Sequence, residues 1–131
     1  MTTKSKPMTK KRILLVDDEE PIVSMEQRML ERYFGYKVTA LTSSIQALEV
    51  FRARPQHFDL VITDMIMPKM TGEILAKEIK GIRPDIPVIL CTAYSECLIK
   101  NKAEDIGGTF LIKPFDLFEM GKTIRKILYK D

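Results

Sequence analysis

Five polar side chains that can do chemistry each follow directly after a short apolar run of the sequence. Asp17 and Asp18 follow ILLV, Asp64 follows LVIT, Thr92 follows VILC and Lys113 follows FLI. If the three carboxylates meet, two like charges at 4 Å repel by about 4 kcal/mol at an effective dielectric constant of 20. A bound cation relieves this repulsion. Oxygen ligands without a nearby His or Cys favour Mg²⁺, with Mn²⁺ as the alternative.

Phosphoryl transfer would use every member of this set. A carboxylate can act as the nucleophile that forms an aspartyl phosphate, and the transfer needs little beyond alignment and charge neutralisation. We expect Asp64 to attack, Asp17 and Asp18 to hold the metal, Lys113 to neutralise one phosphoryl oxygen and the Thr92 hydroxyl to donate to another. Taken singly, these residues also fit a helix cap, a turn or a loop. The phosphate site is the interpretation that explains all five.

The apolar runs predict the strands that position these residues. Short runs rich in Ile and Val are typical of strands buried on both faces of a parallel sheet. The predicted buried strands are Ile13–Val16, Leu60–Thr63, Val88–Cys91 and Phe110–Ile112. The more polar Lys37–Leu41 is expected to be an edge strand.

Segments with helical spacing separate the strands. The expected boundaries are a closing glycine at Gly35, N-caps at Ser44 and Asp116, and a fourth helix from Ser95 to about Asp105. The stripes that indicate helices are Ile22, Met25, Met29 and Tyr33; Leu48 and Phe51; Ile74, Leu75, Ile79 and Ile82; and Leu117, Ile124 and Leu128. Five βα units in alternation predict a doubly wound α/β domain with helices on both faces of a parallel sheet. Ligands of such sheets bind beyond the carboxyl ends of the strands, where the five polar residues fall.

The composition fits one globular domain. The chain has 131 residues, 45% of them hydrophobic and 30% charged, and no apolar run approaches the roughly 20 residues that span a bilayer. We expect a basic flexible leader over residues 1–11, a domain over 12–130, a cytoplasmic location, and neither membrane nor direct nucleic-acid binding. Cys91 and Cys97 match no zinc pattern and are interpreted as reduced.

Four stretches of the sequence resemble the receiver domain of bacterial two-component response regulators. They are ILLVDDEEPI, FDLVITDMIMPKMTG, IPVILCTAYS and FLIKPFD, and the resemblance covers residues 12–129. It implies a flavodoxin-like three-layer sandwich with strand order 2-1-3-4-5. It also implies that a histidine kinase or phosphotransfer protein, or a small phosphodonor, phosphorylates the chain, which acts on an unknown downstream target.

The resemblance assigns further roles to individual residues. Asp64 is implied as the phospho-acceptor, and Asp17, Asp18 and the backbone carbonyl of Ile66 as metal ligands. Thr92 and Phe110 match the switch pair, whose movement alters the surface of the fourth helix, fifth strand and fifth helix, a surface that also offers a dimer contact. A strand phenylalanine such as Phe110 also fits a simple core role.

Two positions that vary in the family influence the lifetime of the phosphoryl group. Here they are Ile66 and Tyr94, and neither offers a carboxylate or amide to orient an attacking water. We therefore predict slow self-dephosphorylation.

Other residues are given structural roles. His57 is expected in a solvated loop. Met65, Met67 and Met70 are expected to fill gaps in packing, and residues 71–73 to start a helix.

Two rival functions remain at this point. One is a receiver-like binding module that works without phosphorylation, although all five polar residues are retained. The other is an aspartyl-nucleophile phosphatase like the haloacid dehalogenases, which place a second Asp where this chain has Ile66. We expect no conventional enzyme beyond self-phosphorylation and dephosphorylation, in a stand-alone regulator or the receiver of a hybrid histidine kinase.

Overall fold

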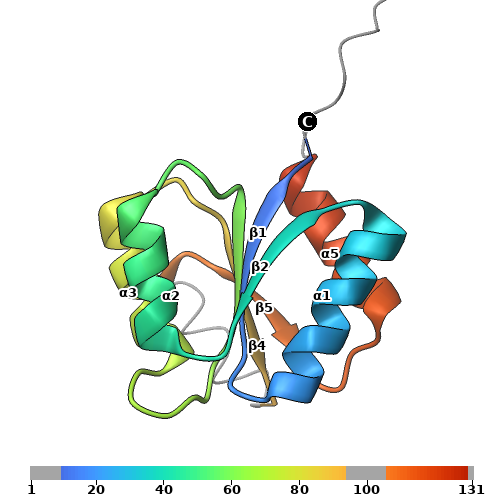
Figure 1. Cartoon of the computed structure of the whole chain (residues 1–131), viewed down its shortest axis with the longest axis horizontal. Helices are drawn as coiled ribbons and strands as arrows, with labels where there is room; N and C mark the ends of the chain where they lie inside the picture. The colour runs from blue at the N-terminus through green and yellow to red at the C-terminus, as the bar shows by residue number, and fades with distance from the viewer. Residues whose placement is uncertain (1–9, 94–105, 130–131) are drawn as a thin grey trace, which may run out of the picture.

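A computed structural model of the chain describes residues 10–93 and 106–129, which form a central sheet with helices on both sides (Figure 1). The elements are β1 (Arg12–Val16), α1 (Glu20–Phe34), β2 (Lys37–Leu41), α2 (Ser44–Ala53), β3 (Leu60–Asp64), α3 (Gly72–Ile82), β4 (Val88–Thr92), β5 (Thr109–Ile112) and α5 (Leu117–Leu128). The predicted fourth helix, Tyr94 and Cys97 lie between β4 and β5, outside the described residues.

The five strands are parallel and stand in the order β2-β1-β3-β4-β5. The predicted doubly wound fold and its strand order are confirmed. The sequence Lys37–Leu41 forms an edge strand, as its polar composition indicated. No described helix is both long and apolar enough to cross a membrane.

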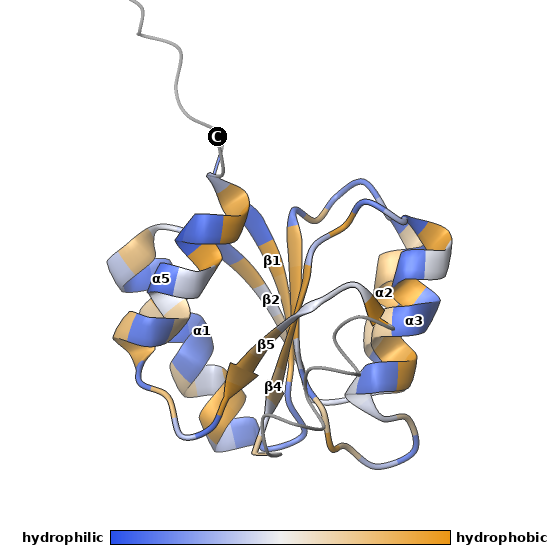
Figure 2. Cartoon of the chain, turned by 180° about the vertical axis from the view of Figure 1, so that it is seen from behind, coloured by the Kyte–Doolittle hydropathy of each residue, from blue (hydrophilic) through white to orange (hydrophobic). Residues whose placement is uncertain are grey.

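Two hydrophobic clusters fill the space on the two faces of the sheet. Alternate residues of β1 point to opposite faces, as expected for a strand. Leu14 and Val16 pack in the cluster under α2 and α3, whereas Ile13 and Leu15 pack in the cluster under α1 and α5. Figure 2 shows apolar strands between helices that carry a mixture of apolar and polar residues. The sheet is therefore buried on both faces, which explains its nearly continuous apolar runs.

Most of the expected helix boundaries are confirmed. Gly35 ends α1 with φ 73°, and Asp116 forms a capping box with Glu119 at the start of α5. The predicted cap of α2 is wrong by one residue. The Ser43 side chain accepts a hydrogen bond from the backbone N–H of Gln46, while Ser44 is buried and donates to the Met70 carbonyl at 2.8 Å.

The apolar stripe that indicated α1 is not its buried face. Val23 and Leu30 are buried, whereas Met25 is 45% and Tyr33 is 66% exposed. The spacing of apolar residues predicted the helix correctly. However, the helix carries two apolar stripes, and only its packing against the sheet determines which of them is buried.

Candidate functional site

The register of the sheet brings the ends of four strands together at one rim. Val16 pairs with Thr63 in adjacent strands, so Asp17 and Asp64 leave neighbouring strands at the same level. Thr92, at the end of β4, pairs with Ile112, the residue before Lys113. Residues that lie far apart in the sequence thus meet where parallel strands end, as predicted.

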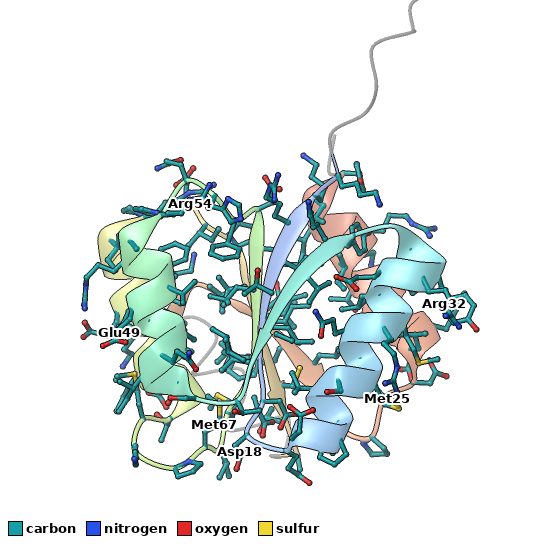
Figure 3. The ribbon with its side chains drawn as sticks, viewed as in Figure 1. Asp18, Met25, Arg32, Glu49, Arg54 and Met67 are labelled. Atoms are coloured by element: carbon teal, nitrogen blue, oxygen red, sulfur yellow. The ribbon has the colours of Figure 1, made fainter. Side chains whose placement is uncertain are left out.

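The three predicted carboxylates form one acidic cluster. Asp17, Asp18 and Asp64 each offer a carboxylate oxygen, and these atoms all lie within 4.8 Å of one another. Asp17 is only 6% exposed, whereas Asp18 faces solvent. Figure 3 shows Asp18 at the lower rim of the molecule.

Burial and crowding perturb Asp17. Burial raises the pKa of its carboxyl group, and the charges of Asp64 and Asp18 raise it further. The backbone N–H of Glu19 opposes this by donating to Asp17 Oδ1 at 3.0 Å, and the charge of Lys113 also lowers the pKa. The net shift of the Asp17 pKa is upward, so burial and the neighbouring carboxylates together disfavour its ionised form. A bound cation would stabilise the ionised form.

Lys113 lies against the predicted acceptor. Its Nζ donates a hydrogen bond to Asp64 Oδ1 at 2.7 Å, and its backbone N–H donates to the Thr92 carbonyl at 2.7 Å. Partial burial lowers the pKa of Lys113, but the hydrogen bond to Asp64 and the charges of Asp64 and Asp17 outweigh it, and the pKa is raised. The amine is therefore a permanent ammonium at neutral pH.

The remaining predicted residues take up different surroundings. Thr92 is buried at the rim, and the side chain of Ile66 is 61% exposed in the loop after Asp64. Phe110 is half-buried and packs against the core cluster on the side of α2 and α3. Met65 and Met67 are buried in that same cluster, which confirms their role in packing.

The acidic cluster suits a hard divalent ion. All three side-chain donors are carboxylate oxygens, which Mg²⁺ and Mn²⁺ accept. The nearest cysteine of the described chain, Cys91, is buried and its pKa is raised by burial, so it offers no thiolate. The carbonyl of Ile66 as a further ligand stays a prediction.

Two residues beside the rim were missed by the sequence analysis. Glu26, on α1, is half-buried in a small cavity that Phe115 and Met120 also line. Burial, reinforced by the charge of Asp17, raises its pKa to about 7. A glutamate in an amphipathic helix carries no sequence signal for this.

The second missed residue is Gly72, the first residue of α3. A Cβ built there would lie 2.0 Å from the carbonyl oxygen of Asp64, and its backbone N–H donates to the Met65 carbonyl at 2.9 Å. Only a residue without a side chain allows α3 to approach the end of β3 this closely. The expectation that residues 71–73 start a helix is confirmed, with Thr71 as the N-cap.

The chain is thus a doubly wound α/β domain with an acidic cluster and a lysine at the carboxyl rim of its sheet. Residues 13–125 match the family model of the response regulator receiver domain. The chain belongs to this family.

Individual relatives agree with this assignment. The chain is 34% identical over 119 residues to the sensor kinase CckA of Brucella abortus, covering 90% of this chain and 12% of that protein. It is 41% identical over 117 residues to the transcriptional regulatory protein ZraR of Escherichia coli, covering 88% of this chain and 26% of that protein. The chain thus spans about a quarter or less of these relatives. A solved receiver domain protein from Clostridium thermocellum superimposes with a TM-score of 0.84 at 31% identity, covering 92% of this chain and 95% of that one.

Proposed function

We propose that this chain is the phospho-acceptor of a two-component phosphorelay and receives a phosphoryl group on Asp64. The observation that carries the proposal is the arrangement around Asp64, with the Lys113 ammonium 2.7 Å from its Oδ1 and carboxylate oxygens of Asp17 and Asp18 within 4.8 Å. A carboxylate between a fixed cation and a metal-binding pair has the surroundings that phosphoryl transfer requires.

The transfer step is a displacement at phosphorus. A carboxylate oxygen of Asp64 forms the new P–O bond while the P–N bond of a phosphohistidine breaks, and the electron pair of that bond stays on the imidazole nitrogen. With acetyl phosphate as donor, a P–O bond breaks instead and acetate leaves. Lys113 exchanges its hydrogen bond to Asp64 for one to a phosphoryl oxygen, and the Thr92 hydroxyl donates to another.

Asp17, Asp18 and Asp64 would hold Mg²⁺, with the Ile66 carbonyl as the fourth protein ligand, and Mn²⁺ would also fit. When bound, the ion neutralises charge on the phosphoryl oxygens. In its absence the chain's own residues still position the acceptor, because Lys113 is fixed to Asp64 by its side chain and to Thr92 by its backbone.

In this proposal, phosphorylation changes the surface of the domain by moving the side chains of Thr92 and Phe110. Thr92 is paired with Ile112 across β4 and β5, and Phe110 is paired with Leu90. The Phe110 ring is only half-buried, so it has room to move when Thr92 turns toward the phosphoryl group. The altered surface would be that of the predicted fourth helix, β5 and α5, which we propose as the contact for a downstream protein or a second copy of the chain.

The donor in this proposal is a histidine kinase or phosphotransfer protein in the cytoplasm. The similarity to a sensor kinase and to a transcriptional regulator supports both a hybrid-kinase receiver and a response regulator as the parent architecture.

The experiment is incubation with acetyl phosphate and Mg²⁺, followed by intact mass measurement. We expect one added phosphoryl group, which is absent from Asp64→Asn and after chelation of the metal. Beryllofluoride should mimic the modification and shift the resonances of Phe110. Failure to label the wild type with acetyl phosphate and with a set of phosphorylated kinases would favour the phosphorylation-independent module. Sustained turnover of phosphate esters would favour the phosphatase.

A further inference from the structure

A second charged region lies at the end of the molecule opposite the acidic cluster. It comprises Arg12, Lys37, Arg54 and His57, which we call the basic pole. Figure 3 shows Arg54 at the upper end of the molecule and Asp18 at the lower end. Arg12 and Lys37 are the first residues of β1 and β2 and are paired across the sheet, and Arg54 is the C-cap of α2.

Within the described part of the chain, the cations of the basic pole form no salt bridges. Within residues 10–93 and 106–129, the salt bridges join Arg52 to Glu78, Lys77 to Glu73, Arg83 to Asp85 and Lys113 to Asp64. None of them involves Arg12, Lys37 or Arg54. The nearby carboxylate, Asp59, accepts a hydrogen bond from the backbone N–H of Arg12 at 2.8 Å rather than pairing with a guanidinium.

Part of the basic pole lines a shallow, open depression of the surface. Arg12, Arg54, Pro55, Gln56 and His57 line an open pocket of about 430 Å³. Two guanidinium groups and an imidazole at the wall of one pocket make it a place where an anion would find several donors at once.

The loop that forms this pocket is held in place from below. Arg83 Nη1 donates to the carbonyl of Pro55 at 3.0 Å and to the carbonyl of Phe58 at 2.6 Å. The backbone N–H of His57 donates to the Arg54 carbonyl at 3.0 Å, and the His57 ring packs edge-on against Phe58. A preorganised loop loses little conformational entropy when it binds a ligand.

His57 reports the electrostatic character of the pocket. Burial lowers its pKa, and the positive charges of Arg54, Arg12 and Lys37 lower it further, against an opposing effect of Asp59. Three cations outweigh one carboxylate at this position, so the pocket favours negative charge.

We propose that the basic pole binds an anion with two or more phosphate groups, through the side chains of Arg12 and Arg54 and with Lys37 and His57 at its edge. Each guanidinium group can donate a pair of hydrogen bonds to one phosphate group, so an anion with two phosphate groups can satisfy Arg12 and Arg54 at once, whereas a single carboxylate can satisfy only one of them in this way. Three permanent cations exceed the charge of one orthophosphate, whereas a diphosphate or triphosphate balances them. Such groups occur in inorganic pyrophosphate and in nucleoside diphosphates and triphosphates.

His57 is the single histidine of the chain, so its imidazole resonances are assigned without ambiguity. We would titrate the whole chain with sodium pyrophosphate, tripolyphosphate, ADP or ATP in the absence of divalent cations, and follow His57 by NMR and the affinity by calorimetry. We expect one binding site, a raised pKa of His57 in the complex, and weaker binding of orthophosphate. Equal affinity for pyrophosphate and ADP would identify the diphosphate as the ligand, and tighter binding of ADP would identify the nucleotide.

Matched substitutions distinguish binding at a specific anion site from nonspecific attraction to positive charge. Arg54→Gln and Arg12→Gln should each weaken binding about tenfold or more, since each removes charge-assisted hydrogen bonds. Arg52→Gln removes the same charge from the same helix outside the pocket and should leave the affinity within about twofold. Equal losses from Arg52→Gln and Arg54→Gln would overturn the proposal, as would an unchanged His57 spectrum at millimolar pyrophosphate. Binding of a short single-stranded oligonucleotide at least tenfold tighter than all four small phosphates would replace the proposed ligand class with nucleic acid.

Discussion

The Lys113 ammonium lies 2.7 Å from Asp64 Oδ1, within a rim that otherwise carries the negative charges of Asp17 and Asp18. The lysine therefore partly neutralises the acidic cluster before any metal binds. Lysine and a divalent cation compete for the same negative charge, and this competition gives the first prediction.

Lys113→Met should bind Mg²⁺ about threefold to tenfold more tightly than the wild type, because a fixed positive charge beside the cluster is removed. The same variant should be phosphorylated far more slowly, since it lacks the cation that stabilises the phosphoryl oxygens. Calorimetric titration with Mg²⁺ and the rate of labelling by acetyl phosphate measure the two effects. Weaker Mg²⁺ binding by this variant would show that Lys113 supports the metal site rather than competing with it.

Asp17→Asn should stabilise the metal-free protein by about 1 kcal/mol at pH 7.5, because it removes a buried carboxylate whose pKa is raised by burial and by its acidic neighbours. An asparagine oxygen can still accept the hydrogen bond from the Glu19 backbone N–H. Mg²⁺ should raise the melting temperature of the wild type and leave that of the variant unchanged. Thermal unfolding with and without Mg²⁺ tests both parts, and an equal response to Mg²⁺ in the two proteins contradicts the assignment of Asp17 as a ligand.

Glu26 should make the stability of the protein depend on pH. Its pKa is raised from 4.5 to about 7 by burial, so folding takes up a proton within this window. Its contribution to stability is therefore fully present below pH 4.5 and is lost as the pH rises through about 7. Glu26→Gln should be more stable than the wild type by about 1 kcal/mol at pH 8, after allowance for partial solvent exposure, and equal to it at pH 4. Urea unfolding at the two pH values measures this difference, and a difference that does not change with pH would show that folding leaves the pKa of Glu26 unshifted.

Gly72 and Gly81 form a matched pair at the two ends of α3. Gly72→Ala should destabilise the protein by about 2 kcal/mol or more, because its Cβ would lie 2.0 Å from the Asp64 carbonyl oxygen. Nothing lies within 4 Å of a Cβ at Gly81, so Gly81→Ala should stabilise the helix by about 0.5–1 kcal/mol. Urea unfolding of both variants compares the close approach with the simple helix propensity. A stabilised Gly72→Ala would mean that the loop after Asp64 moves aside freely.

The sequence predicted those parts of the site that depend on periodicity. Asp17, Asp64 and Thr92 could be placed at one rim because each ends a short apolar run, and parallel strands align such ends. The order of the strands followed from the resemblance to a family. Ser43 was missed as the cap of α2 because Ser43 and Ser44 are equally good caps, and only the burial of Ser44 against Met70 distinguishes them.

The features that escaped prediction arise from tertiary packing. Glu26 has an ordinary helix position in the sequence, and its raised pKa comes from burial beside Phe115 and Met120 and from the charge of Asp17. Gly72 is a common helix-start residue, and its close approach to Asp64 follows from the path of the β3–α3 loop. The spacing of residues along the sequence carries no information on either feature.

The lifetime of the phosphoryl group provides a prediction that depends on Ile66. Its side chain is 61% exposed in the loop after Asp64, and it presents only hydrocarbon to any water that approaches the rim. An amide at this position could orient such a water by a hydrogen bond of about 1 kcal/mol, which corresponds to about a fivefold faster hydrolysis. Ile66→Asn should therefore shorten the lifetime about fivefold, and adding Tyr94→Glu should shorten it further. Because Ile66 is exposed, Ile66→Ala is a suitable control that removes bulk without adding a polar group. If Ile66→Ala accelerates decay as much as Ile66→Asn, the isoleucine acts by shielding the phosphoryl group from water, and the orientation argument is wrong.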